Sequence, residues 1–272
     1  MKNKSLIFLL VLSLAFTILL AGCGTNANQS AGDNSLEKIK TAGKFIVGLD
    51  DSFPPMGFKS KKGEIVGFDI DLAKEAAKRM GVEVEFKPVD WDGVLLTLNS
   101  GEIDVIWNGL TITEERAKQI AFTKPYLTDR QIIVVKAGNN SVKTKADLAD
   151  KVVGLQLGSS SESALNADTE VAKAIKEVKK YDNNTAALMD LKIGRTDAVI
   201  VDEVVGRYYI ATKPGEYSVL EDNFGEESFG VGIRQADKTF LAELQKTIDE
   251  MIADGTAGEI SKKWFGEDIM TK

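Results

Sequence analysis

The chain has 272 residues and a formal net charge of −7 at pH 7, with one cysteine and no histidine. This acidic balance argues against nucleic acid as a partner, because phosphate binding needs a basic surface. Histidine is the commonest transition-metal ligand and the commonest general base, so its absence excludes a zinc site and a Ser-His triad. We therefore expect no metal and no cofactor. We also expect a fold held by packing, since one cysteine forms no internal disulfide.

The first 22 residues have the layout of a signal peptide. Lys2 and Lys4 precede an apolar stretch from Leu6 to Leu20, which is shorter than the roughly 20 residues of a comfortable membrane span. The tetrapeptide Leu-Ala-Gly-Cys follows, closed by Cys23. This tetrapeptide resembles the bacterial lipobox, in which the cysteine thiol becomes a lipid thioether and the cysteine becomes the new N-terminus.

A buried free thiol is the alternative for Cys23, because cysteine often packs as a small hydrophobe. Residues 24–35 are polar, however, and offer almost nothing to bury, so they indicate a flexible tether. We expect residues 1–22 to be a lipoprotein signal peptide and residues 23–35 to be a lipidated tether with acyl chains such as palmitate. The protein would then lie outside the cytoplasm, on the outer face of a Gram-positive membrane or in a Gram-negative periplasm.

Strands and helices alternate from Leu36 onward, in the rhythm typical of a parallel α/β sheet. Apolar residues four apart, with charged residues between them, predict a helix over Asp69–Met80 that Gly81 ends. The same reasoning predicts the other elements of this block: strands Phe45–Leu49, Val82–Phe86 and Ile103–Trp107, and a short helix Val94–Leu98 that Gly101 stops.

A second block repeats this pattern, so two α/β lobes fit the sequence better than one. The last helix carries an apolar stripe whose simplest meaning is packing. The predicted elements are strands Ile132–Val135, Val152–Leu157 and Ala198–Val201, and helices Ala186–Ile193 and Asp237–Ala253, with Pro54, Pro55 and Pro125 marking a rigid loop and a lobe boundary.

Three segments in this order and spacing resemble the family 3 extracellular solute-binding proteins, the polar amino-acid receptors of ABC importers. The first segment alone is weak, since Asp69 can simply cap a helix. The resemblance runs from about Leu36 to the C-terminus. The segments are Gly67-Phe68-Asp69-Ile70-Asp71-Leu72, Gly109-Leu110-Thr111-Ile112-Thr113-Glu114-Glu115-Arg116, and Lys262-Lys263-Trp264-Phe265-Gly266.

This resemblance implies a type II periplasmic-binding-protein-like fold, in which two lobes enclose the ligand in a cleft. Each lobe would be a mainly parallel sheet flanked by helices. Lobe 1 would combine residues 36–125 with 231–272, lobe 2 would be residues 131–226, and residues 126–130 and 227–230 would be hinges.

Arg116 is the first candidate site residue. A strand leading through Gly109 to Thr111, into a helix capped by Thr113, aims backbone N–H groups at one point, where an anion is stabilised. The guanidinium one turn later can grip a carboxylate through two parallel hydrogen bonds. The alternative is a solvated residue that balances Glu114 and Glu115. The resemblance implies that Arg116 holds the α-carboxylate of an amino acid.

Other positions match the family's contacts with the amino acid backbone. Thr111 and the carbonyl of Gly109 match contacts to its carboxylate and amino groups. Ser159 and Ser160 follow a strand, and they match a second carboxylate contact, although a Gly-Ser turn is common. Asp202 matches the partner of the α-ammonium group, although a strand-end aspartate is also a usual helix cap.

The remaining positions match those that face the ligand's side chain. Phe53 and Trp91 match a pair of aromatic rings that enclose it, although both residue types are usually core. Asp50, Asn108 and Gln156 match the far end of the pocket, with Asp51 and Ser161 as further candidates. This mixture of a carboxylate and amides does not choose among arginine or another basic amino acid, glutamine and cystine. An acidic ligand fits less well.

The sequence therefore predicts a lipid-tethered, monomeric receptor that captures a polar amino acid and delivers it to an ABC permease and its ATPase, with no catalytic residue. One alternative is an exported cyclohexadienyl dehydratase, acting on prephenate or arogenate, on the same scaffold. Another is an adhesin or sensory lipoprotein. The predicted ligand contacts are Asp50, Phe53, Trp91, Asn108, Gly109, Thr111, Arg116, Gln156, Ser159, Ser160 and Asp202.

Overall fold

The computed structural model describes residues 32–271. Backbone contacts divide the chain into two units, Met1–Asp33 and Asn34–Lys272, and the second contains the fold described below. The predicted signal peptide, Cys23 and most of the predicted tether lie outside the described residues. Across residues 32–271, no helix is both long and apolar enough to cross a membrane.

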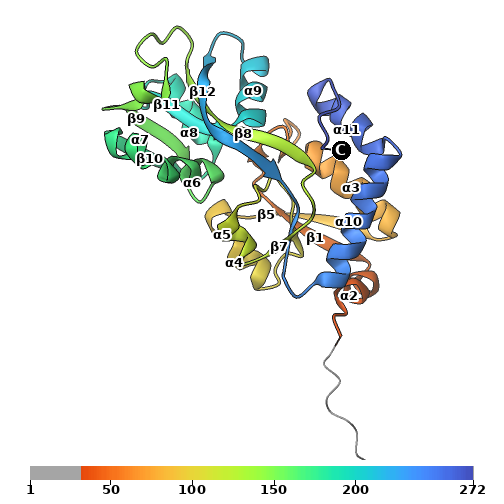
Figure 1. The fold of residues 1–272 in the computed structure, drawn as a ribbon. Helices are drawn as coiled ribbons and strands as arrows, with labels where there is room; N and C mark the ends of the chain where they lie inside the picture. The colour runs from red at the N-terminus through yellow and green to blue at the C-terminus, as the bar shows by residue number, and fades with distance from the viewer. Residues whose placement is uncertain (1–31, 272) are drawn as a thin grey trace, which may run out of the picture. The chain divides into compact units, whose positions relative to one another are not determined.

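The first of two five-stranded sheets contains both the beginning and the end of this unit (Figure 1). Strand β1 pairs in parallel with β5 and β6, and β13 pairs antiparallel with β6 and β7. The spatial order is β5 (Glu83–Pro88), β1 (Lys44–Leu49), β6 (Val105–Ile106), β13 (Gly232–Ile233) and β7 (Ala121–Phe122).

The second sheet lies entirely in the middle of the chain. Strand β9 pairs in parallel with β10 and β11, whereas β8 pairs antiparallel with β11 and β12. Its order is β10 (Glu177–Tyr181), β9 (Val152–Gln156), β11 (Ala198–Asp202), β8 (Leu127–Lys136) and β12 (Tyr217–Phe229). Both sheets are thus parallel in one half and antiparallel in the other, which refines the expectation of mainly parallel sheets.

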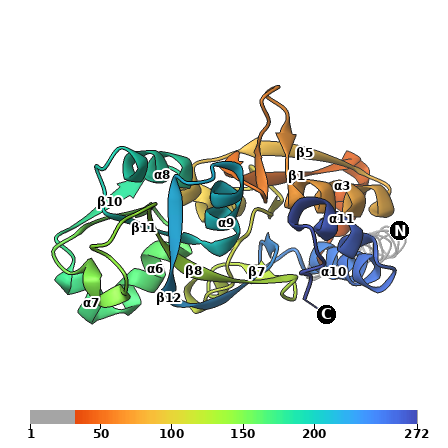
Figure 2. The ribbon, with the colours of Figure 1, turned by 90° about the horizontal axis from the view of Figure 1, so that it is seen from above.

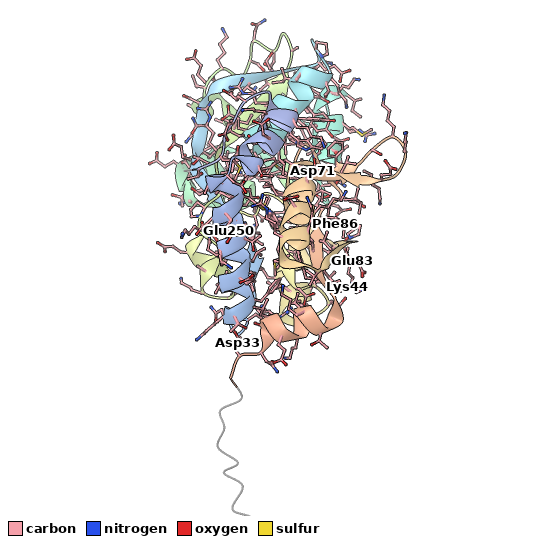
Figure 3. The ribbon with its side chains drawn as sticks, turned by 90° about the vertical axis from the view of Figure 1, so that its right-hand side faces the viewer. Asp33, Lys44, Asp71, Glu83, Phe86 and Glu250 are labelled. Carbon is pink, nitrogen blue, oxygen red and sulfur yellow. The ribbon has the colours of Figure 1, made fainter. Side chains whose placement is uncertain are left out.

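Each sheet is covered on both faces because successive side chains of a strand point to opposite sides. In β1, Phe45 and Val47 pack with α3 and α10, whereas Ile46 packs with the cluster around α4. Figure 3 shows α3 and α10 side by side, with Asp71 and Glu250 labelled on them. The helices around the first sheet are α2 (Ser35–Ala42), α3 (Phe68–Met80), α4 (Val94–Asn99), α5 (Glu114–Ala117), α10 (Lys238–Ala253) and α11 (Thr256–Phe265).

The second sheet repeats this arrangement. Ile132 and Val134 of β8 join one apolar cluster with α8 and α9, and Ile133 and Val135 join another with α6. Figure 2 shows these helices around the sheet. They are α6 (Ser160–Ala167), α7 (Thr169–Ala174), α8 (Asn184–Lys192) and α9 (Glu203–Thr212), and the unit is completed by a small antiparallel sheet, β2 (Ser52–Phe53), β3 (Gly57–Lys59) and β4 (Ile65–Val66), and two 3-10 turns, η1 (Trp91–Gly93) and η2 (Lys145–Leu148).

The chain passes between the sheets twice, and the two passages pair with each other. Leu127 lies opposite Phe229 and Asp129 lies opposite Glu227 in the β8–β12 ladder, and Tyr126 donates its N–H to the Phe229 carbonyl. Figure 1 shows β8 and β12 running together between the sheets. The segments predicted as hinges are therefore paired strands rather than free loops.

Most predicted elements agree with the structure within two residues at each end. Gly81 ends α3 with a positive φ of 68°, as the sequence indicates. One expectation was wrong: β8 begins at Leu127, five residues before the predicted strand Ile132–Val135. Strand β12 was not predicted, because its polar, charged sequence carries no apolar alternation and its partner strand supplies the order.

Candidate ligand-binding site

Four of the predicted site residues lie where strands end. Asp50 directly follows β1, Asn108 lies two residues after β6, and Gln156 and Asp202 are the last residues of β9 and β11. All four are buried. Because the carboxyl ends of neighbouring parallel strands meet at one edge of a sheet, each sheet presents its polar side chains at one edge.

One small cavity brings together residues from both edges. Asp50 and Asn108 do not line it, but Asp50 accepts a hydrogen bond from Gln156 Nε2 (2.8 Å), and its own N–H donates to Asn108 Oδ1 (3.0 Å). The cavity is lined by Phe53, Trp91, Gly109, Thr111, Arg116, Gln156, Ser159, Ser160 and Asp202.

Arg116 is buried there without a carboxylate partner. Its guanidinium donates to two carbonyl oxygens, of Thr111 (3.0 Å) and of Gly158 (3.2 Å). Within residues 32–271 no carboxylate lies within ion-pairing distance of the guanidinium. The residue is only 8% exposed to solvent. Burial lowers the pKa of Arg116, and the more distant charges of Glu227 and Asp202 oppose that shift. A buried cation in this state favours an anionic partner.

The local backbone explains how Arg116 is presented. Thr113 is the N-cap of α5, and its hydroxyl accepts from the Arg116 N–H (3.1 Å), as the sequence predicts. Because α5 has only four residues, its dipole is small, and the guanidinium rather than the helix end is the main positive charge.

Negative charge gathers on the other side of the cavity. Carboxylate oxygens of Asp129, Asp202 and Glu227 all lie within 4.8 Å of one another. Gln131 Nε2 donates to Asp202 Oδ1 (3.0 Å) and to Glu227 Oε1 (2.9 Å), and Thr111 Oγ1 donates to the same glutamate oxygen (3.0 Å). Burial, followed by the charge of Glu227, raises the pKa of Asp129 and of Asp202 well above the usual value. These carboxylates favour a positive group among them.

A chain of amides continues from Asp50. Gln156 Oε1 accepts from Asn184 Nδ2 (3.0 Å), and Asp50 Oδ1 accepts from the hydroxyl of Ser52 (2.6 Å). Burial raises the pKa of Asp50, and among the described residues no lysine or arginine pairs with it. Asn108 Nδ2 is buried with no hydrogen-bond acceptor. Asp50 therefore places a carboxylate without a cation next to Gln156 of the cavity wall, whereas Asn108 Nδ2 lies close to Gly57.

The aromatic candidates serve as core and as cavity wall at once. Trp91 packs with Val94 and Leu98 in one apolar cluster and also lines the cavity. Phe53 lies so close to Gly109 that a Cβ on that glycine would be 2.9 Å from its ring. Gly109 also has a φ of 58°, so a side chain there would be strained as well as crowded.

Comparison with known proteins identifies the family of the chain. The model of the bacterial extracellular solute-binding proteins, family 3, matches residues 45–267. The chain belongs to this family. It is 34% identical over 247 residues to the L-cystine-binding protein TcyJ of Escherichia coli strain K12, covering 90% of this chain and 91% of that protein.

Two solved structures are similar throughout. One is an ABC uptake transporter substrate-binding protein from Streptococcus pneumoniae with bound histidine, at 35% identity and a TM-score of 0.85, covering 89% of this chain and 100% of that one. The other is an ancestral amino acid-binding protein, described as a precursor of cyclohexadienyl dehydratase, at 37% identity and a TM-score of 0.78, covering 85% and 99%. The type II binding-protein fold predicted from the sequence is thus confirmed.

Neither Asp202 nor Asp69 caps a helix with its side chain, which was the simpler alternative for each. Asp202 is the N-cap residue of α9, but its side chain makes no capping hydrogen bond. Asp69 does not cap α3, whose N-cap is Gly67. Of the two further candidates, Asp51 forms an ion pair with Lys59, and Ser161 donates to Gln131 instead of lining the cavity.

The sequence did not single out Glu227, Gln131 or Asp129. Glu227 and Asp129 fell in the segments expected to be hinges, and Gln131 directly follows the first of them. The only signal for them was that these segments would cross between the lobes side by side, so that polar residues within them would face the cleft. That pairing is non-local and no local pattern carries it.

Proposed function

We propose that this protein is a receptor that captures a polar amino acid outside the cytoplasmic membrane and delivers it to an ABC importer. One observation carries the proposal: the cavity wall contains the buried guanidinium of Arg116, which has no carboxylate partner, and Asp202, which belongs to a cluster of three crowded carboxylates. An α-amino acid carries a carboxylate and an ammonium group on one carbon. Such a zwitterion neutralises both sides at once.

In this proposal Arg116 grips the α-carboxylate, with Thr111 and Ser160 beside it, and Asp202 with Glu227 holds the ammonium group. Contacts already join the two sides: Thr111 Oγ1 and Ser160 Oγ lie 3.0 Å apart, within hydrogen-bonding distance, and Thr185 Oγ1 donates to the Ser52 carbonyl (3.2 Å). A zwitterion meets both sets of charges only when the cleft is closed, so binding favours the closed form. A micromolar ligand supplies about 8 kcal/mol, more than a hinge equilibrium of a few kcal/mol requires.

The end of the cleft selects the side chain. Asp50 offers a carboxylate without a cation, and Gln156, whose amide group donates to it, lines the cavity. We therefore propose a ligand whose side chain carries N–H groups or a positive charge and an acceptor, which keeps arginine, glutamine and cystine in the set. The similarity to receptors named for cystine and histidine supports this class.

Calorimetry against the common amino acids and cystine tests the proposal. We expect at least one ligand to bind with micromolar or tighter affinity and to raise the melting temperature, because a ligand that binds only the folded state stabilises it. If none of them binds better than about millimolar, a value typical of incidental contact, the proposal is wrong.

The anchor is part of the same proposal. Cys23 would carry lipid, and the tether would hold a monomeric receptor near its permease and ATPase. Tethering would raise the concentration of the receptor at the permease without a membrane-spanning helix. A Cys23→Ala variant should be released into the medium while it binds its amino acid as tightly as the wild type. Retention of the variant in the membrane fraction would contradict the lipobox assignment.

A dehydratase remains the second candidate, because one observation favours it. Asp202 is a buried carboxyl in the cavity wall, and burial raises its pKa well above the usual value, in the direction that favours a general acid. The similar ancestral structure is itself an amino acid-binding protein, and its description as a precursor of cyclohexadienyl dehydratase links this scaffold to that activity. Incubation with prephenate, followed by absorbance of phenylpyruvate, decides between the two. Loss of amino-acid uptake in a deletion strain separates transport from adhesion or sensing.

A further inference from the structure

Asp69 is a buried carboxylate that lies outside the cavity but contacts its wall. It is the second residue of α3 and has no exposed surface. Its Oδ2 accepts from the Gly109 N–H (2.7 Å) and from the Tyr126 hydroxyl (2.9 Å), while its Oδ1 has no partner. Tyr126 is the one titratable group in contact with it, and no described lysine or arginine pairs with it.

The two partners of Asp69 are both connected to the proposed ligand site. Gly109 lines the cavity and has a left-handed backbone against the Phe53 ring. Among residues 32–271, no hydrogen bond reaches the Gly109 carbonyl oxygen, which leaves it free for a ligand. Tyr126 directly precedes β8, the first passage between the sheets, and its backbone bonds to Phe229 and Thr271. Asp69 therefore ties the cavity wall to the start of that passage.

This arrangement is costly for the fold. A carboxylate removed from water without a cation loses its hydration, and two hydrogen bonds return only part of it. Accordingly, burial raises the pKa of Asp69 to about 7, against the opposing effects of the Gly109 N–H, the Tyr126 hydroxyl and the Trp107 indole. A residue retained only for packing would be more stable as a neutral side chain of the same shape.

We propose that Asp69 is a positioning residue of the ligand site, whose carboxylate holds the Asn108–Gly109 peptide in its ligand-binding orientation at a cost to the stability of the fold. This inference rests on the proposed function and deepens it. The carboxylate acts through the Gly109 backbone, and it does not itself line the cavity.

The test is the isosteric variant Asp69→Asn, measured at about pH 8, where the wild-type carboxylate is ionised. The melting temperature of the ligand-free variant should rise or stay equal, because a buried charge is removed. The dissociation constant for the best amino acid should increase about tenfold, the effect of weakening one charge-assisted hydrogen bond. A purely structural residue would move both quantities in the unfavourable direction.

Two further variants complete the design. Asp71→Asn, on the same turn of α3, contacts Lys263 and Trp264 at the surface and should leave binding unchanged. Tyr126→Phe removes one of the two donors to Asp69 and should weaken binding by a smaller factor than Asp69→Asn.

The outcomes separate the two proposals. An Asp69→Asn protein that binds as tightly as the wild type, or that loses stability or fails to fold, overturns the positioning role alone. A wild-type protein that binds no amino acid overturns the proposed function and the positioning role with it.

Discussion

The two sides of the cavity are built alike but carry opposite charge. Each is formed by polar residues at the carboxyl ends of parallel strands, β1 and β6 on one side and β9 and β11 on the other. The first side adds the Arg116 guanidinium, which has no ion-pair partner, and the second adds Asp202, which belongs to a carboxylate cluster with no described cation. A buried charge without a partner is unfavourable on either side. A zwitterion that bridges the two sides supplies the missing partner of each and is therefore bound.

Removing the positive side should have the largest effect. Arg116→Ala should weaken amino-acid binding by about 2–5 kcal/mol, because the ligand carboxylate would be buried without its partner. The affinity of Arg116→Lys should lie between those of the wild type and Arg116→Ala, since a lysine keeps the charge but not the paired hydrogen bonds. Calorimetry measures both, with Arg195→Ala as control, because Arg195 is exposed and pairs only with Asp190. An alanine variant with wild-type affinity would contradict the assignment of the carboxylate to this side.

Much of this comparison follows from sequence, and some of it does not. Asp50, Gln156 and Asp202 were predicted because strand ends are marked by local apolar runs and by a family resemblance. Glu227 and Gln131 were not, because they reach Thr111 and Asp202 of the cavity wall only through the pairing of β8 with β12, which joins residues about a hundred positions apart. For Asp69 the sequence offered helix capping as the simpler alternative, and only the fold reveals that its carboxylate contacts Gly109 instead.

Reducing the negative side should change two measurements in opposite directions. Glu227→Gln keeps an acceptor for Thr111 and Gln131 but removes one charge beside Asp129 and Asp202. Binding of the ammonium group should weaken by roughly tenfold, as for one charge-assisted contact. The ligand-free variant should be more stable than the wild type at neutral pH, because less repulsion is stored in the cluster.

The stability gain of Glu227→Gln should depend on pH in a definite direction. An acid whose pKa is higher in the folded than in the unfolded state destabilises the fold as pH rises above its unfolded value of about 4. The pKa values of Asp129 and Asp202 are raised in this way, partly by Glu227. The stability gain of Glu227→Gln should therefore shrink as pH falls from neutral toward about 4, as followed by thermal unfolding. Glu226→Gln, an exposed neighbour, should show no such trend, and the same trend in both variants would show that the cluster is not its source.

Loss of an aromatic contact outside the cavity should have the smallest effect on ligand affinity. This change tests whether charge alone stabilises the closed form. Phe58 of β3 packs against Tyr208 of α9, with ring centroids 5.7 Å apart, and against Trp264 of α11 at 6.0 Å. Neither Phe58 nor Tyr208 lines the cavity, yet their contact joins the two sides of the molecule. An aromatic pair contributes about 0.5–1.5 kcal/mol beyond its buried area, so Tyr208→Ala should weaken ligand binding about two- to tenfold by disfavouring closure.

Tyr208→Phe keeps the ring contact and should bind as the wild type does, which separates closure from loss of the hydroxyl. Small-angle scattering of the ligand-free proteins should show a larger radius of gyration for Tyr208→Ala, because fewer contacts hold the cleft shut. If the alanine variant keeps both the wild-type affinity and the wild-type radius, the aromatic contact contributes nothing to closure. The opposite charges of the two cavity walls, bridged by the ligand, would then account for the closed form.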